Sequence, residues 1–180
     1  MKIIKITDSK YPKRLLEIKN PPKQLYVKGN DELLNNDSLA IVGSRKCTSY
    51  GIKYAKKFAS DISKNNITII SGLALGIDAV AHEFSKDSKG KTIAVVGCGL
   101  DNIYPEENKE LFKQILENDG CIISEYPPGT EINTKNFPRR NRIISGISMG
   151  VLVIEAACKS GSTITAVSYT HLTLPTNSLV

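Results

Sequence analysis

The 180-residue sequence has few of the residues that bind metals and none of the long apolar runs that cross membranes. It contains two histidines and four cysteines, and no two of Cys47, Cys98, Cys121 and Cys158 form a C-x-x-C pair. This spacing argues against a zinc site and against a disulfide framework, so we expect reduced, mostly buried cysteines. No apolar run approaches the roughly 20 residues of a membrane span, and the N-terminus has no signal-peptide core. We therefore expect a cytoplasmic protein without membrane contact, metal or other cofactor.

Familiar nucleotide-binding and catalytic motifs are also missing. The sequence has no P-loop, and G-C-G-L-D-N at residues 97–102 lacks the third glycine of a dinucleotide fingerprint. No G-x-S-x-G nucleophile elbow is present. His82 falls inside an expected helix, where a lone histidine is more often structural than catalytic. We therefore expect no catalytic residue and no enzymatic activity.

What the chain does contain is a regular alternation of apolar runs and amphipathic segments. Five short, β-branched apolar runs occupy residues 38–43, 67–71, 91–97, 120–124 and 150–156. Most are continuous rather than alternating, which is typical of strands buried on both faces of a sheet. The segments between them have helical periodicity. The alternation predicts an α/β fold, a Rossmann-like three-layer αβα architecture with a mostly parallel sheet.

The helical periodicity is clearest in residues 50–65. Apolar side chains recur there at three- and four-residue steps, with lysines opposite, and the expected buried face is Ile52, Ala55, Phe58, Ala59 and Ile62. Residues 1–37 differ, because they combine a short helical piece, a Pro-Pro turn and a strand-like Q-L-Y-V-K-G. We interpret residues 1–37 as an N-terminal extension packed on a core domain of residues 38–166.

Small and polar residues follow the apolar runs, at the edge where an open parallel sheet binds ligands. Gly43-Ser44-Arg45, Ser71-Gly72 and Ser160-Gly161 all take such positions. Glycines let a backbone approach a ligand closely, and helix N-termini present free N–H groups to an anion. Phosphate binding without a standard nucleotide motif is therefore expected. Asp78 either caps the helix that it opens, which we favour, or pairs with Glu125 as two neighbouring carboxylates.

The stretch N-F-P-R-R-N-R-I-I-S-G at residues 136–146 is the strongest single signal. Arg139, Arg140 and Arg142 lie within four residues, with Phe137 just before them and an apolar Ile-Ile just after. Arginine matches phosphate with two parallel hydrogen bonds, and an aromatic ring stacks on an unpaired base. The pattern predicts a single-stranded nucleic-acid contact at the start of a short helix, which cannot aim all three arginines the same way. Asn141 could instead fix the local backbone.

The charge distribution agrees with a localised basic patch. Residues 40–128 hold 11 basic and 11 acidic side chains, whereas residues 1–39 hold 8 against 5 and residues 129–180 hold 5 against 2. The formal net charge of +6 therefore comes from the two ends of the chain. Such a patch favours an anionic partner, most often phosphate.

These motifs together resemble the DNA-processing protein A family, also called DprA or Smf. The resemblance covers residues 11–166 and includes I-V-G-S-R-K-C-T-S-Y-G, I-I-S-G-L-A-L-G-I-D-A-V-A-H, G-C-I-I-S-E-Y-P-P-G-T, F-P-R-R-N-R-I-I-S-G-I-S and V-L-V-I-E-A-A-C-K-S-G-S-T-I-T-A. It implies a Rossmann-like domain that binds single-stranded DNA, protects incoming DNA in natural transformation and loads the RecA recombinase. It also implies a homodimer, and no catalysis or metal.

By motif position, the resemblance implies a set of DNA-contacting residues. They are Gly43, Ser44, Arg45, Ser71, Gly72, Phe137, Arg139, Arg140, Asn141 and Arg142, with Ser160 and Gly161 lining the same pocket. Arg45 and the later arginines would hold phosphates, and Phe137 would contact a base or sugar. Residues 167–180, V-S-Y-T-H-L-T-L-P-T-N-S-L-V, depart from the family pattern. We interpret them as a non-native tail on a domain truncated at its C-terminal end, which makes dimerisation and RecA loading doubtful.

Two other functions remain open on the residues alone. One is an enzyme of the related Rossmann group that cleaves nucleotides, similar to the phosphoribohydrolases. The other is a sensor that binds a nucleotide at the same edge of the sheet. The phosphoribohydrolase motif P-G-G-x-G-T-x-x-E is replaced here by E-A-A-C-K-S-G-S-T at residues 155–163, so that enzyme would lack its diagnostic residues.

Overall fold

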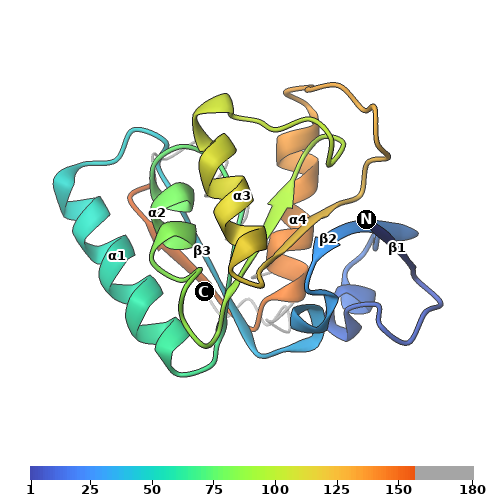
Figure 1. Cartoon of the computed structure of the whole chain (residues 1–180), viewed down its shortest axis with the longest axis horizontal. Helices are drawn as coiled ribbons and strands as arrows, with labels where there is room; N and C mark the ends of the chain where they lie inside the picture. The colour runs from blue at the N-terminus through green and yellow to red at the C-terminus, as the bar shows by residue number, and fades with distance from the viewer. Residues whose placement is uncertain (157–180) are drawn as a thin grey trace, which may run out of the picture.

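A computed structural model describes residues 1–156, and the structural statements below concern this part of the chain. Its centre is a seven-stranded sheet in the order β1-β2-β6-β5-β4-β3-β7 (Figure 1). The strands are β1 (Lys2–Lys5), β2 (Gln24–Gly29), β3 (Ser38–Gly43), β4 (Thr68–Ser71), β5 (Thr92–Val96), β6 (Cys121–Ser124) and β7 (Val151–Ile154). Strands β3 to β7 run parallel, whereas β1 and β2 join antiparallel at the β6 side.

The helices cover both faces of this sheet (Figure 1). They are α1 (Ser49–Lys64), α2 (Ile77–Glu83), α3 (Lys109–Glu117) and α4 (Asn136–Ile147), with the 3-10 helices η1 (Lys13–Glu17), η2 (Asp31–Asn35) and η3 (Glu106–Asn108). One face packs against α1, α2 and α3, and the other packs against α4 together with η1 and η2. The predicted Rossmann-like three-layer α/β fold is confirmed. No helix of the described chain is both long and apolar enough to cross a membrane.

The five predicted parallel strands form for the reason that the sequence suggests. Both faces of β4, β5 and β6 are covered, so every residue of these strands is buried. A continuous apolar run is stable only in that position, because each alternate side chain must find a core of its own. The residues of β5 illustrate this, since Ile93 and Val95 join the α4 core while Ala94 and Val96 join the α3 core.

Helix α1 packs by its small residues. Gly51, Ala55 and Ala59, each four residues after the last, are buried along one stripe, and this allows a close approach to the sheet. The expectation that Ile52 belongs to the buried face was wrong, because it lies one position round the helix from Gly51 and is 43% exposed. Phe58 and Ile62 are half-buried.

The N-terminal residues 1–37 are part of the main sheet and of its core. Strand β2 matches the expected strand Q-L-Y-V-K-G, whereas β1 lies in a stretch for which no element was predicted. The helical piece is the 3-10 helix η1, whose Leu15 is fully buried. Gly146 of α4 provides the room, because a methyl group there would lie 2.6 Å from Ile18 Cγ2 and 2.9 Å from Leu15 Cδ1.

The histidine of α2 is a core residue. His82 is fully buried, and its Nδ1 lies 2.7 Å from Thr92 Oγ1, which lies 2.8 Å from the Ile69 carbonyl oxygen. Both contacts are satisfied when His82 donates to Thr92 and Thr92 donates to Ile69. Burial lowers the pKa of His82 to about 3, so the ring is neutral.

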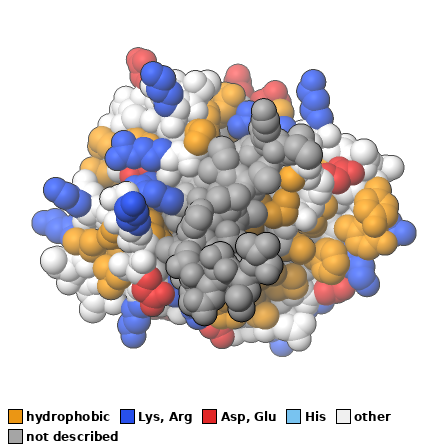
Figure 2. Space-filling view, turned by 180° about the vertical axis from the view of Figure 1, so that it is seen from behind, with side chains coloured by type: hydrophobic (Ala, Val, Ile, Leu, Met, Phe, Trp, Pro, Cys, Tyr) orange, Lys and Arg blue, Asp and Glu red, His pale blue; other side chains and the backbone are white. Residues whose placement is uncertain are grey.

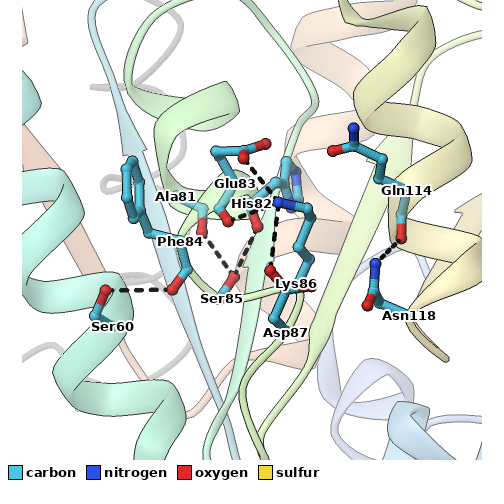
Figure 3. A network of polar contacts seen from close by, with 10 residues as sticks. All are labelled: Ser60, Ala81, His82, Glu83, Phe84, Ser85, Lys86, Asp87, Gln114 and Asn118. Carbon is cyan, nitrogen blue, oxygen red and sulfur yellow. Dashed lines mark hydrogen bonds and ion pairs between the residues drawn. The ribbon is translucent and has the colours of Figure 1, made fainter.

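The end of α2 carries a polar network around this histidine (Figure 3). Ser85 Oγ donates to the Ala81 carbonyl oxygen at 2.6 Å. The Lys86 ammonium, although buried, donates to Glu83 Oε1 at 2.7 Å and lies 3.6 Å from Asp87 Oδ2. These contacts lie at the amino edge of the sheet, since the chain enters β5 at Thr92. The network therefore terminates α2 far from the carboxyl ends of the strands.

Replacing Leu15 by alanine should lower the free energy of unfolding by about 2–5 kcal/mol, because the change leaves a cavity under α4. Leu16→Ala is the matched control, since its side chain is 49% exposed and should change stability by less than about 0.5 kcal/mol. Urea denaturation followed by circular dichroism measures both. Equal effects in the two variants would show that residues 1–37 are not part of the cooperative core.

His82 predicts a pH dependence of stability. An unfolded histidine binds a proton below about pH 6.5, whereas the buried ring stays neutral down to about pH 3, so the unfolded state binds more protons between these values. The unfolding free energy should therefore fall with decreasing pH, with His82 contributing up to about 1.4 kcal/mol per pH unit. Urea titrations of wild type and His82→Gln between about pH 7 and pH 4.5 should diverge in slope. Parallel curves would contradict the assignment of a neutral buried ring.

Candidate nucleic-acid interface

The loops that follow the parallel strands meet at the carboxyl edge of the sheet. Helix α4 crosses from β6 to β7 behind the sheet, and β7 pairs with β3, whose following helix α1 lies on the other face. The connections therefore change direction between β3 and β7, and the space beyond the ends of such strands is the usual ligand position in open parallel sheets. Most of the predicted site residues are at this edge. Ser160 and Gly161 lie outside the described residues.

The loop after β3 is held from two sides and presents Arg45 to solvent. The Ser44 carbonyl oxygen accepts from Ile77 N at 3.1 Å, and Ser44 N donates to the Ile154 carbonyl oxygen at 3.4 Å. Gly76 has a φ of 78° and closes against this loop, because a side chain there would strike the Ser44 and Arg45 carbonyls. Arg45 is exposed and forms no ion pair with residues 1–156.

The N-terminus of α1 is occupied by a carboxylate of the protein itself. Thr48 caps the helix by accepting from Gly51 N at 3.3 Å, and Glu155 accepts from Thr48 N at 2.7 Å and from the Thr48 hydroxyl. The Thr48 hydroxyl and backbone N–H lower the pKa of Glu155. In dinucleotide-binding folds a helix N-terminus at this position receives a phosphate. Here Glu155 fills the equivalent space beside Gly51.

Arg140 crosses the ends of β4 and β5 as a buried cation. Its side chain is 4% exposed, and its Nη1 donates to the Gly72 carbonyl oxygen at 2.8 Å and to the Val95 carbonyl oxygen. Its Nε donates to Asn141 Oδ1 at 3.1 Å. Burial lowers the pKa of Arg140 to about 10, opposed by the nearby Asp78 carboxylate. Arg140 is therefore a structural cation that fastens α4 to the sheet.

Gly72 lies between the two members of this buried charge pair. Its N–H donates to Asp78 Oδ2 at 3.1 Å, and a methyl group at Gly72 would lie within 2.8 Å of both Arg140 Nη atoms and of Asp78 Oδ2. Burial raises the pKa of Asp78, and Arg140 opposes the shift. Ser71, one residue earlier, donates its hydroxyl hydrogen to the Ile41 carbonyl oxygen at 2.6 Å. Both residues of the predicted Ser71-Gly72 pair thus have internal partners.

Arg142 is held by a second carboxylate. Its Nη1 and Nη2 donate to Glu125 Oε1 and Oε2 at 2.8 and 2.7 Å, in a bidentate pair. Its Nε donates to the Asn20 carbonyl oxygen at 3.0 Å, and Nη1 also donates to the Arg139 carbonyl oxygen at 2.8 Å. Glu125 is therefore paired with Arg142, whereas Asp78 accepts from Gly72 N and lies in the field of Arg140. Arg142 joins the start of α4 to the N-terminal segment.

Two aromatic rings form a platform at the same edge. Phe137 stacks on Tyr104, with ring centroids 5.3 Å apart and an interplanar angle of 27°. Gly97 at the end of β5 supports the Phe137 ring, because a methyl group there would lie 2.9 Å from Phe137 Cδ1. Tyr104 is 40% exposed, and Arg139 in the first turn of α4 is exposed. Sequence reasoning missed Tyr104, although the adjacent Pro105 marks a chain turn after β5.

The structure thus separates the predicted residues into two groups. Gly43, Ser44, Arg45, Phe137 and Arg139 are partly or well exposed at the edge, whereas Ser71, Gly72, Arg140 and Asn141 are buried beneath it. Within residues 1–156, no three histidine, cysteine, aspartate or glutamate side chains come together as metal ligands would. The exposed chemistry of the edge therefore consists of arginine cations and stacked rings.

The comparison with known proteins decides the family. A sequence model of DNA recombination-mediator protein A matches residues 2–173 of the chain. The chain belongs to this family. It is 47% identical over 163 residues to Protein Smf of Synechocystis, a match that covers 88% of this chain and 41% of that protein. It is 46% identical over 160 residues to DNA processing protein DprA of Streptococcus pneumoniae, which covers 89% of this chain and 56% of that protein. The chain thus spans about half the length of these curated relatives.

Solved structures of the family agree with the fold. The X-ray structure of DprA from Streptococcus pneumoniae superposes with a TM-score of 0.89 at 42% identity, covering 95% of this chain and 60% of that one. DNA processing protein A from Helicobacter pylori, described for its single-stranded DNA binding mode, superposes with a TM-score of 0.86 at 32% identity. That match covers 97% of this chain and 79% of the Helicobacter pylori chain.

The adjacent arginines of α4 should respond differently to substitution. Arg140→Met leaves the buried Asp78 carboxylate uncompensated and should lower the free energy of unfolding by about 3–5 kcal/mol. Arg139→Met removes an exposed cation and should change stability by less than about 0.5 kcal/mol. Chemical denaturation of both variants measures the difference. A stability loss confined to Arg139→Met would reverse the roles given to the two side chains.

Proposed function

We propose that the carboxyl edge of the sheet binds single-stranded DNA. The observation that carries the proposal is the placement of two exposed cations, Arg45 and Arg139, beside the stacked rings of Phe137 and Tyr104. Arg45 follows β3 and Phe137 lies over the end of β5, two strands away, which is about 10 Å at the usual strand spacing. Proteins that bind single-stranded nucleic acid generally combine phosphate-binding cations with aromatic side chains on which the bases stack.

The proposed role of each residue depends on whether its side chain is exposed or buried. Arg45 and Arg139 hold phosphates, the exposed loop Gly43-Ser44 approaches the backbone of the strand, and Phe137 with Tyr104 stacks on a base. The buried residues Ser71, Gly72, Arg140 and Asn141, together with Arg142, position these groups through the contacts described above. Ser160 and Gly161 keep their proposed place in the same pocket on the basis of the family motif alone. No residue has a catalytic role.

The platform favours single strands over duplexes. In a duplex the base faces are stacked on their neighbours and cannot reach a protein ring, whereas an unpaired base can. The family description as a recombination mediator and the single-stranded DNA binding of the Helicobacter pylori relative support the same assignment.

The wider role follows the family. The protein acts in the cytoplasm, protects incoming single-stranded DNA in uptake and recombination, and passes it to the RecA recombinase. It does so as a homodimer when the whole protein is present. Because the chain spans about half the length of the curated relatives, these partners are properties of the complete protein in this proposal.

The two nucleotide-based alternatives have less support. A phosphoribohydrolase or a nucleotide sensor needs a phosphate pocket at a helix N-terminus, and the N-terminus of α1 already receives the Glu155 carboxylate. Glu125 is paired with Arg142, and Asp78 is buried with its carboxylate bound by Gly72 N, which leaves no free carboxylate pair for acid–base chemistry. An assay for base release from nucleoside monophosphates tests the enzyme directly.

Binding to oligo-dT and to duplex DNA at several salt concentrations tests the proposal. Wild type should prefer oligo-dT, and Arg45→Ala or Arg139→Ala should each flatten the plot of log affinity against log salt by about 0.7. Phe137→Ala should weaken binding by about 1–3 kcal/mol with an unchanged salt slope, because it removes stacking and no charge. Arg14→Ala, an exposed arginine at the amino edge of the sheet, is the matched control. Equal affinity for duplex DNA and oligo-dT, or an unchanged affinity of Arg45→Ala for oligo-dT, would contradict the assignment of single-strand binding.

A further inference from the structure

The antiparallel strands β1 and β2 bring the N-terminal segment to the carboxyl edge of the parallel sheet. Tyr26 pairs with Ser124 at the end of β6, so the residues just before β2 lie beyond that end. Ile6 N donates to the Lys23 carbonyl oxygen at 2.9 Å, which continues the pairing of β1 and β2 to this edge. The chain therefore passes Lys23 at the same edge as Arg45 and Phe137.

Arg142 fixes the segment before β2 against α4. Its Nε holds the Asn20 carbonyl oxygen, while the same guanidinium holds Glu125 and the Arg139 carbonyl oxygen. Lys19 and Lys23, on either side of Asn20, are thereby tied to the turn of α4 that presents Arg139. Tyr11 adds a second anchor, since its hydroxyl donates to the Pro22 carbonyl oxygen at 2.7 Å.

Four lysines of the N-terminal segment differ in whether they form an ion pair. At the amino edge, Asp31 pairs with Lys2 and with Lys10 at 2.8 Å, and these hydrogen bonds lower its pKa to about 2. At the carboxyl edge, Lys19 and Lys23 are exposed and form no ion pair within residues 1–156. Within the N-terminal segment, Lys2 and Lys10 are thus engaged by Asp31, whereas Lys19 and Lys23 remain available to a ligand.

Two acidic groups near these lysines have partners of their own. Glu125 is bound by Arg142, and the Asp8 carboxylate accepts from Lys5 N at 2.8 Å in its own turn. Glu17, the last residue of η1, is exposed two residues before Lys19 and lines a cavity of about 380 Å³ together with Arg14 and Asp37. Figure 2 shows Lys and Arg side chains gathered on the side of the molecule where the N-terminal segment lies.

We propose that the DNA-binding surface continues past Arg139 onto the N-terminal segment, where Lys19 and Lys23 contact phosphates of the same single strand. The inference rests on the proposed function and extends it. The order β2-β6-β5-β4-β3 puts four strand spacings, or about 19 Å, between the start of β2 and the loop that carries Arg45. A strand lying across the whole edge would therefore meet Arg45 first, then the ring platform and Arg139, and finally the two lysines.

The test uses two labelled oligo-dT probes of about 4 and about 16 nucleotides, the two ends of the range of ordinary single-strand site sizes. Lys19→Gln combined with Lys23→Gln should weaken binding of the long probe several-fold and flatten its salt slope by about 1.4, since each phosphate contact contributes about 0.7. Binding of the short probe should not change. The matched control combines Lys64→Gln with Lys89→Gln, two exposed lysines at the amino edge without ion pairs in the described chain, and should behave as wild type.

The outcomes separate the two proposals. If wild type binds neither probe, the proposed function fails, and the extended surface fails with it. If wild type binds both probes and the Lys19/Lys23 variant keeps the wild-type slope on the long probe, only the extension is overturned. An equal loss on the short probe, or an equal loss in the Lys64/Lys89 control, also overturns the extension. Unchanged urea midpoints of both double variants show that the comparison is between folded proteins.

Discussion

The arrangement of the carboxyl edge depends on one buried guanidinium. Carbonyl oxygens at the ends of parallel strands have no further strand residue to bond, and Arg140 donates to those of Gly72 and Val95. Removing its charge from water is costly, which is why its pKa falls to about 10 and why Asp78 lies beside it. The contacts of Arg140 fix the orientation of the first turns of α4. That orientation determines the positions of Phe137 and Arg139 on the same helix.

The same constraint decides how much of the basic charge is free. Three arginines in four residues suggest a strongly basic patch, yet Arg140 is enclosed by the sheet and Arg142 is neutralised by Glu125. Arg139 alone of the three extends from α4 into solvent. Helical geometry makes the division necessary, because neighbouring positions differ by about 100° round the axis. Formal charge in a sequence therefore overstates the electrostatic surface that a ligand meets.

The fold could be predicted from the sequence, and the site only in outline. Strands such as β5 are specified by continuous apolar runs, and the edge at which Gly72 and Phe137 meet follows from the parallel topology. The partners of Arg140 and Arg142 could not be predicted, because Val95 and Glu125 are distant in the chain and nothing local marks them. Strand β1 could not be predicted from hydrophobic pattern, because three of its four residues are exposed. It forms by pairing with β2 and not by burial of its own side chains.

The N-terminus of α1 gives the clearest argument about the kind of ligand. A single nucleotide is held chiefly by a backbone anion site at a helix N-terminus, which grips one phosphate group from several directions. In this chain Glu155 and Thr48 close that position, and Gly51 leaves just enough room for the carboxylate. The remaining features are an exposed arginine after β3, stacked rings at β5 two strand spacings away, and a further arginine on α4 beyond the rings' Phe137. Contacts spread along a line in this way suit a polymer with a phosphate at every unit, because each cation meets a different unit of the same chain.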